Sequence, residues 1–383
     1  MMAEIQDTRV PVTILTGFLG AGKTTLLNHL ISKYSDKKLA VIENEFGEIG
    51  IDNELVIRPE NGIFELSNGC ICCTLNDELV TTLENLLNSP YSFNHLLIET
   101  TGIAEPDAIA AAFLATPDIQ RTFRVDGVVC VADAPHVVGI LEERDEARAQ
   151  LTFADFVVIN KASEVGAEEM QAIKALLRQV NPFADMEAVD YCRVESPVLE
   201  LRAYAADTLE RKIREQTDHD CDEHCTHDHH HHHAHEHKHE HTHEHKHGEH
   251  GHECDEHCEH HHEHGEHGHK HHHHHHTDIM SESFVLDTPL DMLKFRHWVN
   301  VVLLIQKQSI YRIKGIINFA WEEQKLVFQS VQQMFAFQRG EAWAKGEKKQ
   351  TRIVFIGKNL RRDILEKSLR QCFYKAEEYE EMG

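Results

Sequence analysis

The sequence predicts an α/β protein in which a doubly wound, mostly parallel sheet is followed by a small α+β domain. Between residues 10 and 160, short β-branched apolar runs alternate with helical stretches. The continuous apolar character of these runs is typical of parallel strands that are buried on both faces. From residue 281 onward, a helical stretch precedes three strand-like runs and a last helix. A chain of 383 residues is also long enough for two domains.

The first domain is expected over residues 1–205. Its strand-like runs are residues 10–17, 38–44, 93–100, 125–133 and 153–160. Helical stretches such as 23–34 and 76–88 lie between them. This order repeats the strand–helix–strand unit, and such repeats form a doubly wound sheet with helices on both faces.

The second structured domain is expected over residues 281–383. Its predicted elements are a helix at 289–306, strand-like runs at 309–320, 325–338 and 351–360, and a helix from about 361. A few strands flanked by two helices are typical of a small α+β domain.

Residues 206–280 are rich in His, Glu, Asp and Lys, and residues 218–276 alone contain 30 of the 34 histidines. With almost no large apolar side chains, this segment is predicted to be a disordered linker. Neutral imidazoles bind Zn²⁺, Ni²⁺, Co²⁺ or Cu²⁺. The sequence CDEHC occurs twice, and its cysteines are Cys221, Cys225, Cys254 and Cys258. These four thiols form either one metal site or two sites that each include a histidine. Metal buffering or loading is favoured over a plain acidic spacer, which needs neither His nor Cys.

The formal net charge of −26 disfavours nucleic acid, whose phosphates attract Lys and Arg. No apolar run approaches the ~18 residues of a membrane span, and the N-terminal residues do not resemble a secretory signal. We therefore expect a cytoplasmic protein without a membrane partner. In a reducing compartment, the ten cysteines indicate metal binding or redox chemistry rather than disulfides.

The sequence GFLGAGKT, residues 17–24, follows a predicted strand, opens a predicted helix and matches the phosphate-loop pattern. Backbone N–H groups of such a loop surround phosphate oxygens, aided by the positive end of the helix dipole. Lys23 is expected to reach the β- and γ-phosphates, and Thr24 to bind Mg²⁺. This pattern predicts a P-loop NTPase fold. The residues expected to bind the nucleotide here are Gly17, Gly20, Ala21, Gly22, Lys23, Thr24 and Thr25.

Two further features follow the phosphate loop in the order typical of P-loop enzymes. Glu99 ends a predicted strand and is expected to be the acidic residue near Mg²⁺. Gly102 follows three residues later, where its backbone N–H has room to approach the γ-phosphate. Lys23, Thr24 and Glu99 are therefore the predicted catalytic residues.

The sequence NKAS, residues 160–163, resembles the N-K-x-D guanine motif of GTPases. Asn160 and Lys161 match that motif, but Ser163 stands where the aspartate is expected. A hydroxyl cannot accept the two N–H bonds that a carboxylate accepts from guanine, so the preference for guanine should weaken. The neighbouring Glu164 is a candidate for compensating this loss. GTP remains the predicted nucleotide.

Cys70, Cys72 and Cys73 place three thiols within four positions. Thiolates select Zn²⁺ over Mg²⁺, and an incomplete set of ligands suits a site that releases its metal. Buried packing cysteines are disfavoured by the polar flanking residues. A redox pair is disfavoured because C-x-C and adjacent cysteines are strained as disulfides and no thioredoxin-like context is present.

Together, these motifs resemble the metallochaperone GTPases of the CobW/HypB/UreG type, and the CobW-like branch most of all. The resemblance rests on GFLGAGKTT, ENEFGEIGID, NGCICC, IETTGIAEPD, VDGVVCVADA and NKAS, which occur in that order. It covers residues 9–200, and the sequences IYRIKGIINF and TRIVFIGKNL extend it to residues 284–373.

This resemblance implies GTP hydrolysis coupled to delivery of a metal, usually Zn²⁺ and in some members Co²⁺ or Ni²⁺, to a client metalloenzyme. It also implies that Cys70, Cys72 and Cys73 form the internal metal site, with Glu45 as an oxygen ligand. Because these segments lie where GTPases place their switches, we hypothesise that γ-phosphate and Mg²⁺ order them and close the thiol site.

Two other functions remain open. In the first, the chain is a nucleotide-responsive metal buffer or sensor with no delivery cycle. In the second, it is a P-loop kinase that acts on a small molecule, which leaves the cysteines unexplained. The sequence does not identify the client protein or the oligomeric state, and it is compatible with a homo-oligomer.

Overall fold

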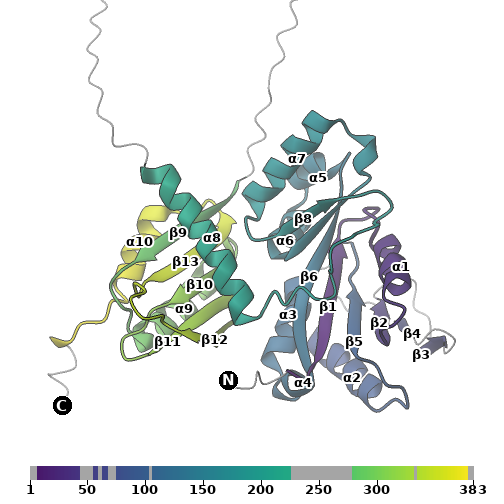
Figure 1. Cartoon of the computed structure of the whole chain (residues 1–383), viewed down its shortest axis with the longest axis horizontal. Helices are drawn as coiled ribbons and strands as arrows, with labels where there is room; N and C mark the ends of the chain where they lie inside the picture. The colour runs from purple at the N-terminus through teal and green to yellow at the C-terminus, as the bar shows by residue number, and fades with distance from the viewer. Residues whose placement is uncertain are drawn as a thin grey trace, which may run out of the picture.

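The structure, a computed structural model, describes residues 7–43, 55–58, 63–67, 75–102, 106–225, 278–331 and 334–377. Figure 1 shows two sheets that lie side by side, with the N-terminal sheet on the right and the C-terminal sheet on the left. Among the helices of these ranges, none is long and apolar enough to cross a membrane.

The N-terminal sheet contains eight described strands in the order β3-β4-β2-β5-β1-β6-β7-β8. Their bounds are Val10–Gly17 (β1), Leu39–Glu43 (β2), Leu55–Arg58 (β3), Ile63–Ser67 (β4), His95–Glu99 (β5), Phe123–Asp133 (β6), Phe156–Asn160 (β7) and Asp185–Ala188 (β8). Every adjacent pair is parallel except β3–β4, so the prediction of a mostly parallel sheet is confirmed.

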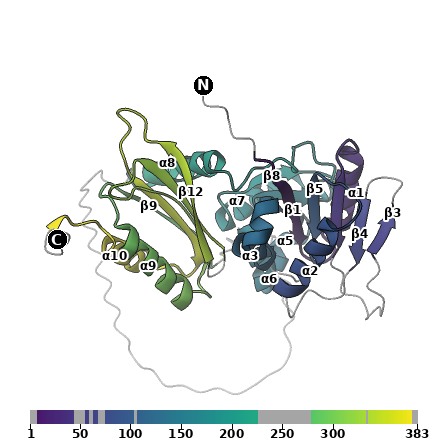
Figure 2. The same cartoon turned by 90° about the horizontal axis from the view of Figure 1, so that it is seen from below.

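Helices cover both faces of this sheet, as a doubly wound fold requires (Figure 2). Their bounds are Lys23–Lys33 (α1), Leu75–Leu87 (α2), Pro106–Ala115 (α3), Pro117–Thr122 (α4), Val137–Glu143 (α5), Asp145–Phe153 (α6) and Ala167–Val180 (α7). Alternate residues of the strands pack in opposite directions. In β1, Leu15 lies in the same core cluster as α1, whereas Val12 and Ile14 share a cluster with α2 and α3. The apolar runs are thus buried on both faces.

The C-terminal sheet is antiparallel, with five described strands in the order β12-β11-β10-β13-β9. Its elements are Ile279–Leu286 (β9), Met292–Ile305 (α9), Ile310–Ile317 (β10), Gln324–Val331 (β11), Met334–Ala342 (β12), Thr351–Lys358 (β13) and Arg362–Arg370 (α10). Helices α9 and α10 pack on one face through a core that includes Phe295, Leu365 and Phe355. The small α+β architecture is therefore confirmed.

Some predicted boundaries are wrong. Residues 325–338 are not one strand, because β11 ends at Val331 and β12 pairs back on it. Residues 153–155 do not belong to β7, since α6 continues to Phe153. Strands β3, β4, β8 and β9 were not predicted.

The segment 206–280 is partly ordered, which corrects the prediction of a disordered linker. Helix α8 occupies Ala206–Cys225, and β9 begins at Ile279. Leu209 and Ile213 of α8 are buried, and they share a core cluster with Ile316 of the C-terminal sheet. Residues 226–277, including the second CDEHC motif, lie outside the described residues.

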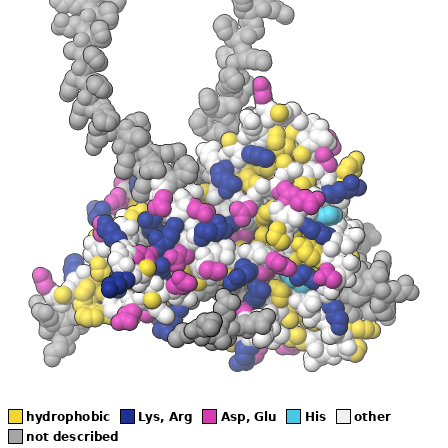
Figure 3. All heavy atoms as spheres, viewed as in Figure 1, with side chains coloured by type: hydrophobic (Ala, Val, Ile, Leu, Met, Phe, Trp, Pro, Cys, Tyr) yellow, Lys and Arg dark blue, Asp and Glu magenta, His cyan; other side chains and the backbone are white. Residues whose placement is uncertain are grey.

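Helix α8 crosses the face of the C-terminal sheet opposite α9 and α10 (Figures 1 and 2). Its Glu210 carboxylate accepts a hydrogen bond from Lys325 Nζ of β11 at 2.7 Å and pairs with Arg214 at 3.1 Å. On the face shown in Figure 3, the Lys and Arg side chains of the described residues are interspersed with Asp and Glu. Charge pairing, together with the buried residues of α8, attaches this helix to the C-terminal sheet.

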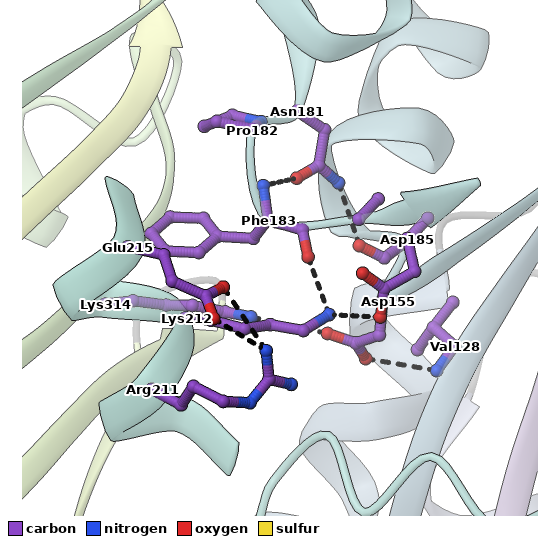
Figure 4. Close-up of polar contacts among 12 residues, drawn as sticks. Val128, Asp155, Asn181, Pro182, Phe183, Asp185, Arg211, Lys212, Glu215 and Lys314 are labelled. Carbon is purple, nitrogen blue, oxygen red and sulfur yellow. Dashed lines mark hydrogen bonds and ion pairs between the residues drawn. The ribbon is translucent and has the colours of Figure 1, made fainter. Parts of the chain in front are cut away.

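A buried charge cluster joins the two sheets. The Asp155 carboxylate, immediately before β7, accepts hydrogen bonds from Arg312 Nη2 at 3.0 Å and Lys314 Nζ at 3.4 Å, both from β10. All three side chains are at most 2% exposed. Figure 4 shows Lys314 and Asp155 close to Lys212, whose ammonium lies between the Phe183 carbonyl and Asp185. The two domains are therefore coupled through buried charged side chains.

His95 gives the first testable consequence of burial. It is buried in β5, its Nε2 lies 2.9 Å from Thr13 Oγ1, and burial, aided by Lys37 and Arg124, lowers its pKa to about 3. Between pH 6.5 and 3, the unfolded chain therefore binds a proton that the folded chain does not. We expect this site to cost up to about 1.4 kcal/mol of stability per pH unit as the pH falls.

The measurement is the difference in free energy of unfolding between wild type and His95→Gln from pH 7 to pH 4. Glutamine still bonds to Thr13 but does not titrate, so its pH slope should be shallower. The exposed histidine of α9 provides the control His297→Gln. Equal slopes for wild type and His95→Gln would show that the buried ring does not resist protonation.

Candidate nucleotide and metal site

The phosphate loop lies at the carboxyl end of β1, where Gly17 leads into a turn that ends at Lys23, the first residue of α1. Gly17, Gly20 and Gly22 have φ angles of 139°, 75° and 109°, which side chains rarely adopt. A Cβ on Gly17 would also lie 2.3 Å from the Val131 carbonyl oxygen of β6. The glycines therefore give the loop a shape that other residues cannot take, with the N-terminus of α1 at its end.

The predicted magnesium ligands meet in the structure. Thr24 Oγ1 donates a hydrogen bond to Glu99 Oε1 at 2.9 Å, and the Glu99 side chain is buried at the end of β5. The next residue, Thr100, donates from its backbone to the Leu15 carbonyl and from its hydroxyl to Thr16 Oγ1. These contacts fix the end of β5 against β1. A hydroxyl and a carboxylate are the hard oxygen ligands that Mg²⁺ prefers, so these residues fit that ion.

Lys23 lies over the loop, with its Nζ 3.4 Å from the Phe18 carbonyl oxygen. Burial lowers the pKa of Lys23, and the nearby Glu99 carboxylate opposes that effect. This long hydrogen bond is weak by the usual geometric limits, so the ammonium is poorly satisfied in the loop itself. Phosphate oxygens would provide the acceptors it lacks.

The remaining predicted loop residues surround this centre. Ala21 is buried, and its N–H donates to the Phe18 carbonyl. Thr25 is exposed in the first turn of α1. Gly102 packs so closely on Leu19 that a Cβ would lie 2.6 Å from that side chain. Its carbonyl accepts a hydrogen bond from Gln150, a positioning residue that the sequence analysis did not identify.

Asn160 ends β7, and Lys161 follows it. Both side chains form hydrogen bonds with other residues of the protein. Asn160 Nδ2 donates to the Ala21 carbonyl at 3.0 Å, and its Oδ1 accepts from Cys192 N at 3.0 Å. Asn160 therefore ties the phosphate loop to the segment after β8. Lys161 Nζ lies 2.6 Å from Asp133 Oδ2, and this hydrogen bond raises the pKa of Lys161. Asp133 thus positions Lys161.

Ser163 is exposed beside this pair and donates two hydrogen bonds to the Asp190 carboxylate. Asp190 lies 27 residues further along the chain and was not a predicted site residue.

The predicted metal ligands lie mostly outside the described residues. Glu45, Cys70, Cys72 and Cys73 are in the ranges 44–54 and 68–74, and Cys254 and Cys258 are in 226–277. Cys221 and Cys225 lie one turn apart in α8. Among the residues that the structure does describe, no group of three His, Cys, Asp or Glu side chains could hold a metal ion.

The strands that lead into the internal metal motif are nevertheless described. Glu43 of β2 pairs with Ser67 of β4 on one side and with Glu99 of β5 on the other. Because parallel neighbours lie about 4.8 Å apart, the ends of β4, β2 and β5 span only about 10 Å. Segments 44–54 and 68–74 therefore start from adjacent strands, at the sheet edge that carries Glu99 and the phosphate loop.

A parallel sheet, a glycine loop between its first strand and a helix, and a Thr–Glu pair at the loop define a P-loop nucleotide-binding protein. Comparison with known families is more specific. The model of the CobW/HypB/UreG nucleotide-binding domain matches residues 11–187, and that of the cobalamin synthesis protein CobW C-terminal domain matches residues 279–373. The chain belongs to the CobW/HypB/UreG family and carries the CobW C-terminal domain.

Individual relatives agree with this assignment. The Escherichia coli zinc chaperone YjiA is 28% identical over 91% of this chain and 94% of its own length. The Pseudomonas aeruginosa zinc chaperone CobW is 36% identical over 50% of this chain and 58% of its own length. A crystal structure of Zn(II)-bound YjiA GTPase from E. coli matches the fold with a TM-score of 0.64 at 24% identity, covering 96% of this chain and 100% of that one.

Proposed function

We propose that this protein is a GTP-dependent zinc chaperone, which binds Zn²⁺ at Cys70, Cys72, Cys73 and Glu45 and delivers it to a client metalloenzyme. The observation that carries the proposal is the shared sheet edge: β2 and β4 lead into the metal motif beside β5, which carries Glu99. The names of the two zinc chaperone relatives support Zn²⁺ as the cargo over Co²⁺ and Ni²⁺. A reducing cytoplasm would keep the thiols available.

The described residues give each step of nucleotide binding a physical basis. The glycine loop and the N-terminus of α1 would bind the phosphates of GTP through backbone N–H groups. Lys23 would exchange its long bond to Phe18 for phosphate oxygens. Thr24 and Glu99 would hold Mg²⁺, which when bound neutralises charge on the β- and γ-phosphate oxygens. No general base is apparent among the described residues of this site, so intrinsic hydrolysis should be slow, as in GTPases that depend on a partner protein.

The coupling of nucleotide binding to metal binding follows from the positions of the strand ends. The strand ends of β2 and β5 are hydrogen-bonded neighbours, so a change of ligand at Glu99 acts next to the start of segment 44–54. We infer that occupancy of the γ-phosphate site raises the affinity of the internal thiols for Zn²⁺ and that hydrolysis lowers it again. The histidine-rich tract, residues 218–276, would store metal or load this site.

The test is a competition titration of Zn²⁺ against a chromogenic chelator, in the presence of Mg²⁺ and GDP, non-hydrolysable GTP or non-hydrolysable ATP. Because α8 extends to Cys225, the variant should replace residues 226–277 with a Gly/Ser segment of equal length. Cys221→Ser and Cys225→Ser remove the remaining thiols of the tract. We expect one Zn²⁺ to bind about 10-fold or more tightly with the GTP analogue, within the usual range of allosteric coupling.

Cys72→Ala in the same background should abolish the nucleotide-dependent site, whereas Cys130→Ala should not, since Cys130 is buried in β6 away from solvent. Equal tightening by the ATP analogue would retain the cycle but reject guanine selectivity. If no nucleotide changes the affinity for Zn²⁺, the delivery cycle fails and a metal buffer becomes the better description.

A further inference from the structure

A carboxylate is present at the guanine motif even though the motif itself lacks one. Ser163 stands at the position of the aspartate in N-K-x-D, and its backbone N–H and hydroxyl both donate to Asp190 Oδ1, at 3.0 and 2.9 Å. The acidic group therefore lies against the position where the motif requires it, but it comes from the segment after β8.

The fold fixes Asp190 from both sides. Strands β7 and β8 are parallel neighbours, and the pairing continues past their ends: Val189 N donates to the Ile159 carbonyl, and Ala162 N donates to the Val189 carbonyl. On the other side, Cys192 N donates to Asn160 Oδ1.

Between these anchors the backbone is unusual. Tyr191 and Cys192 have φ angles of 52° and 53°, which non-glycine residues rarely adopt. The surroundings must compensate for this backbone strain, and such strain is concentrated at functional sites. The turn places the Asp190 side chain over Ser163 rather than out along the strand.

The chemistry of the carboxylate suits guanine. The two hydrogen bonds from Ser163 occupy Oδ1 and orient the group. Among the described residues, no hydrogen-bond donor to Oδ2 is found, so this oxygen keeps its two lone pairs. Guanine presents adjacent N–H donors at N1 and N2, whereas adenine presents an acceptor at N1. An oriented carboxylate that accepts but cannot donate therefore distinguishes the two bases.

We propose that Asp190 is the residue that recognises guanine in this chain and that Ser163 positions it, so that the two have exchanged the roles expected from the motif. The inference rests on the proposed GTP-binding function. It replaces the alternative of Glu164, whose side chain lies exposed in the 3-10 turn Ala162–Glu164 and affects the Lys161 ammonium only through its charge.

The experiment measures binding of fluorescent GDP, ADP and XDP to the full chain with Mg²⁺. Asp190→Asn keeps the shape of the side chain but adds an amide donor opposite the N2 donors of guanine. Xanthine has a carbonyl at that position, which accepts from the amide. We expect Asp190→Asn to lower GDP affinity about 100-fold or more and to raise XDP affinity about 10-fold or more. A gain of XDP binding cannot result from misfolding.

Glu164→Gln is the matched control and should keep the GDP preference. A second variant tests the exchange of roles: Asp190→Ser should lose GDP selectivity, and adding Ser163→Asp should restore it. If wild type prefers GDP but Asp190→Asn retains that preference without gaining XDP, the inference is wrong while the proposed function stands. If wild type shows no preference for GDP over ADP, guanine specificity itself fails, and the role of Asp190 fails with it.

Discussion

Replacing Lys23 with alanine is expected to lower the rate of GTP hydrolysis about 100-fold or more, because the ammonium is the principal charged donor at the phosphate loop. Its Nζ lies 3.4 Å from the Phe18 carbonyl, and burial lowers its pKa. A desolvated cation with one long hydrogen bond is prepared to bind phosphate. Its removal should cost the free protein little stability, since little is broken when the side chain is lost.

The measurement is phosphate release under single-turnover conditions, with Lys174→Ala as the control. Lys174 is an exposed lysine of α7, far along the chain from the loop, and its loss removes the same charge. Thermal unfolding without nucleotide should be similar in both variants and in wild type. Hydrolysis at the wild-type rate in Lys23→Ala would mean that the loop does not bind the reacting phosphate.

Lys23→Ala also distinguishes a nucleotide-dependent zinc chaperone from a metal buffer. The histidine-rich tract should bind the same amount of Zn²⁺ in Lys23→Ala as in wild type, because none of its ligands has changed. Only the part of Zn²⁺ binding that depends on nucleotide should disappear. A variant that keeps the nucleotide-dependent part would show that coupling does not pass through the phosphate loop.

The strands that the sequence predicted are those in the middle of each sheet. Strands β1, β5, β6 and β7 are buried on both faces, so their apolar runs are continuous. Most of the strands that were missed lie at a sheet edge. Strands β3, β8 and β9 are edge strands, and β12, which was merged with β11, is the fourth edge. Among them, β8 and β12 are partly exposed and carry polar residues, as in DMEA of β8, so their apolar pattern is weak.

Helix α8 was missed for a different reason. Its sequence ends in the acidic, histidine-containing CDEHC motif, and that composition indicated disorder for the whole segment. The helical signal is the four-residue spacing of Leu209, Ile213 and Thr217, all of which are buried. Tertiary packing on the C-terminal sheet stabilises a helix whose average composition is polar.

In the candidate site, too, local sequence motifs were predictable, whereas contacts between distant segments were not. A phosphate loop is a local motif, so the sequence alone places its glycines, Lys23 and Thr24 between a strand and a helix, which are β1 and α1 in the structure. The contact of Asp190 with Ser163 depends on the register of β7 and β8, which no local pattern encodes. One signal was available: Ser163 left the motif without a carboxylate, and such a gap directs attention to acidic residues after the neighbouring strand.

The sequence also contained a signal for the interface between the domains. Arg312 and Lys314 alternate with apolar residues in β10, so both point to one face of an otherwise apolar strand. Two adjacent cations on a buried face require an acidic partner, and that partner is Asp155, more than 150 residues away in sequence.

Asp155→Asn is expected to destabilise the protein by about 3–5 kcal/mol, because it leaves two buried cations without their counter-charge. Burial acts to raise the pKa of Asp155, but Arg312 and Lys314 more than offset it and hold that pKa below its usual value. The carboxylate is therefore ionised in the folded protein. Its Oδ2 also accepts a hydrogen bond from Val128 N at 3.1 Å, which an asparagine carbonyl oxygen at this position preserves. The variant thus removes the charge and leaves the backbone contact.

The loss of stability in Asp155→Asn should depend on pH in a defined direction. Burial, together with Arg312, lowers the pKa of Lys314 to about 7 despite the attraction of Asp155. Between pH 7 and 10.5, the unfolded chain keeps a proton on this lysine that the folded chain releases, so stability from this group rises with pH. Asp155→Asn should therefore cost more at pH 6, where Lys314 is charged in the wild type, than at pH 9, where it is neutral.

Chemical denaturation measures this effect in both domains at once. All three tryptophans, Trp298, Trp321 and Trp343, lie in the C-terminal domain, so their fluorescence reports that domain, while loss of bound fluorescent GDP reports the other. Asp145→Asn, which changes an exposed carboxylate of α6, is the control. Adding Arg312→Met and Lys314→Met to Asp155→Asn removes the buried charges and should recover most of the lost stability. If the triple variant is as unstable as Asp155→Asn alone, unpaired charge is not the cause, and the packing of this interface is what holds the two domains together.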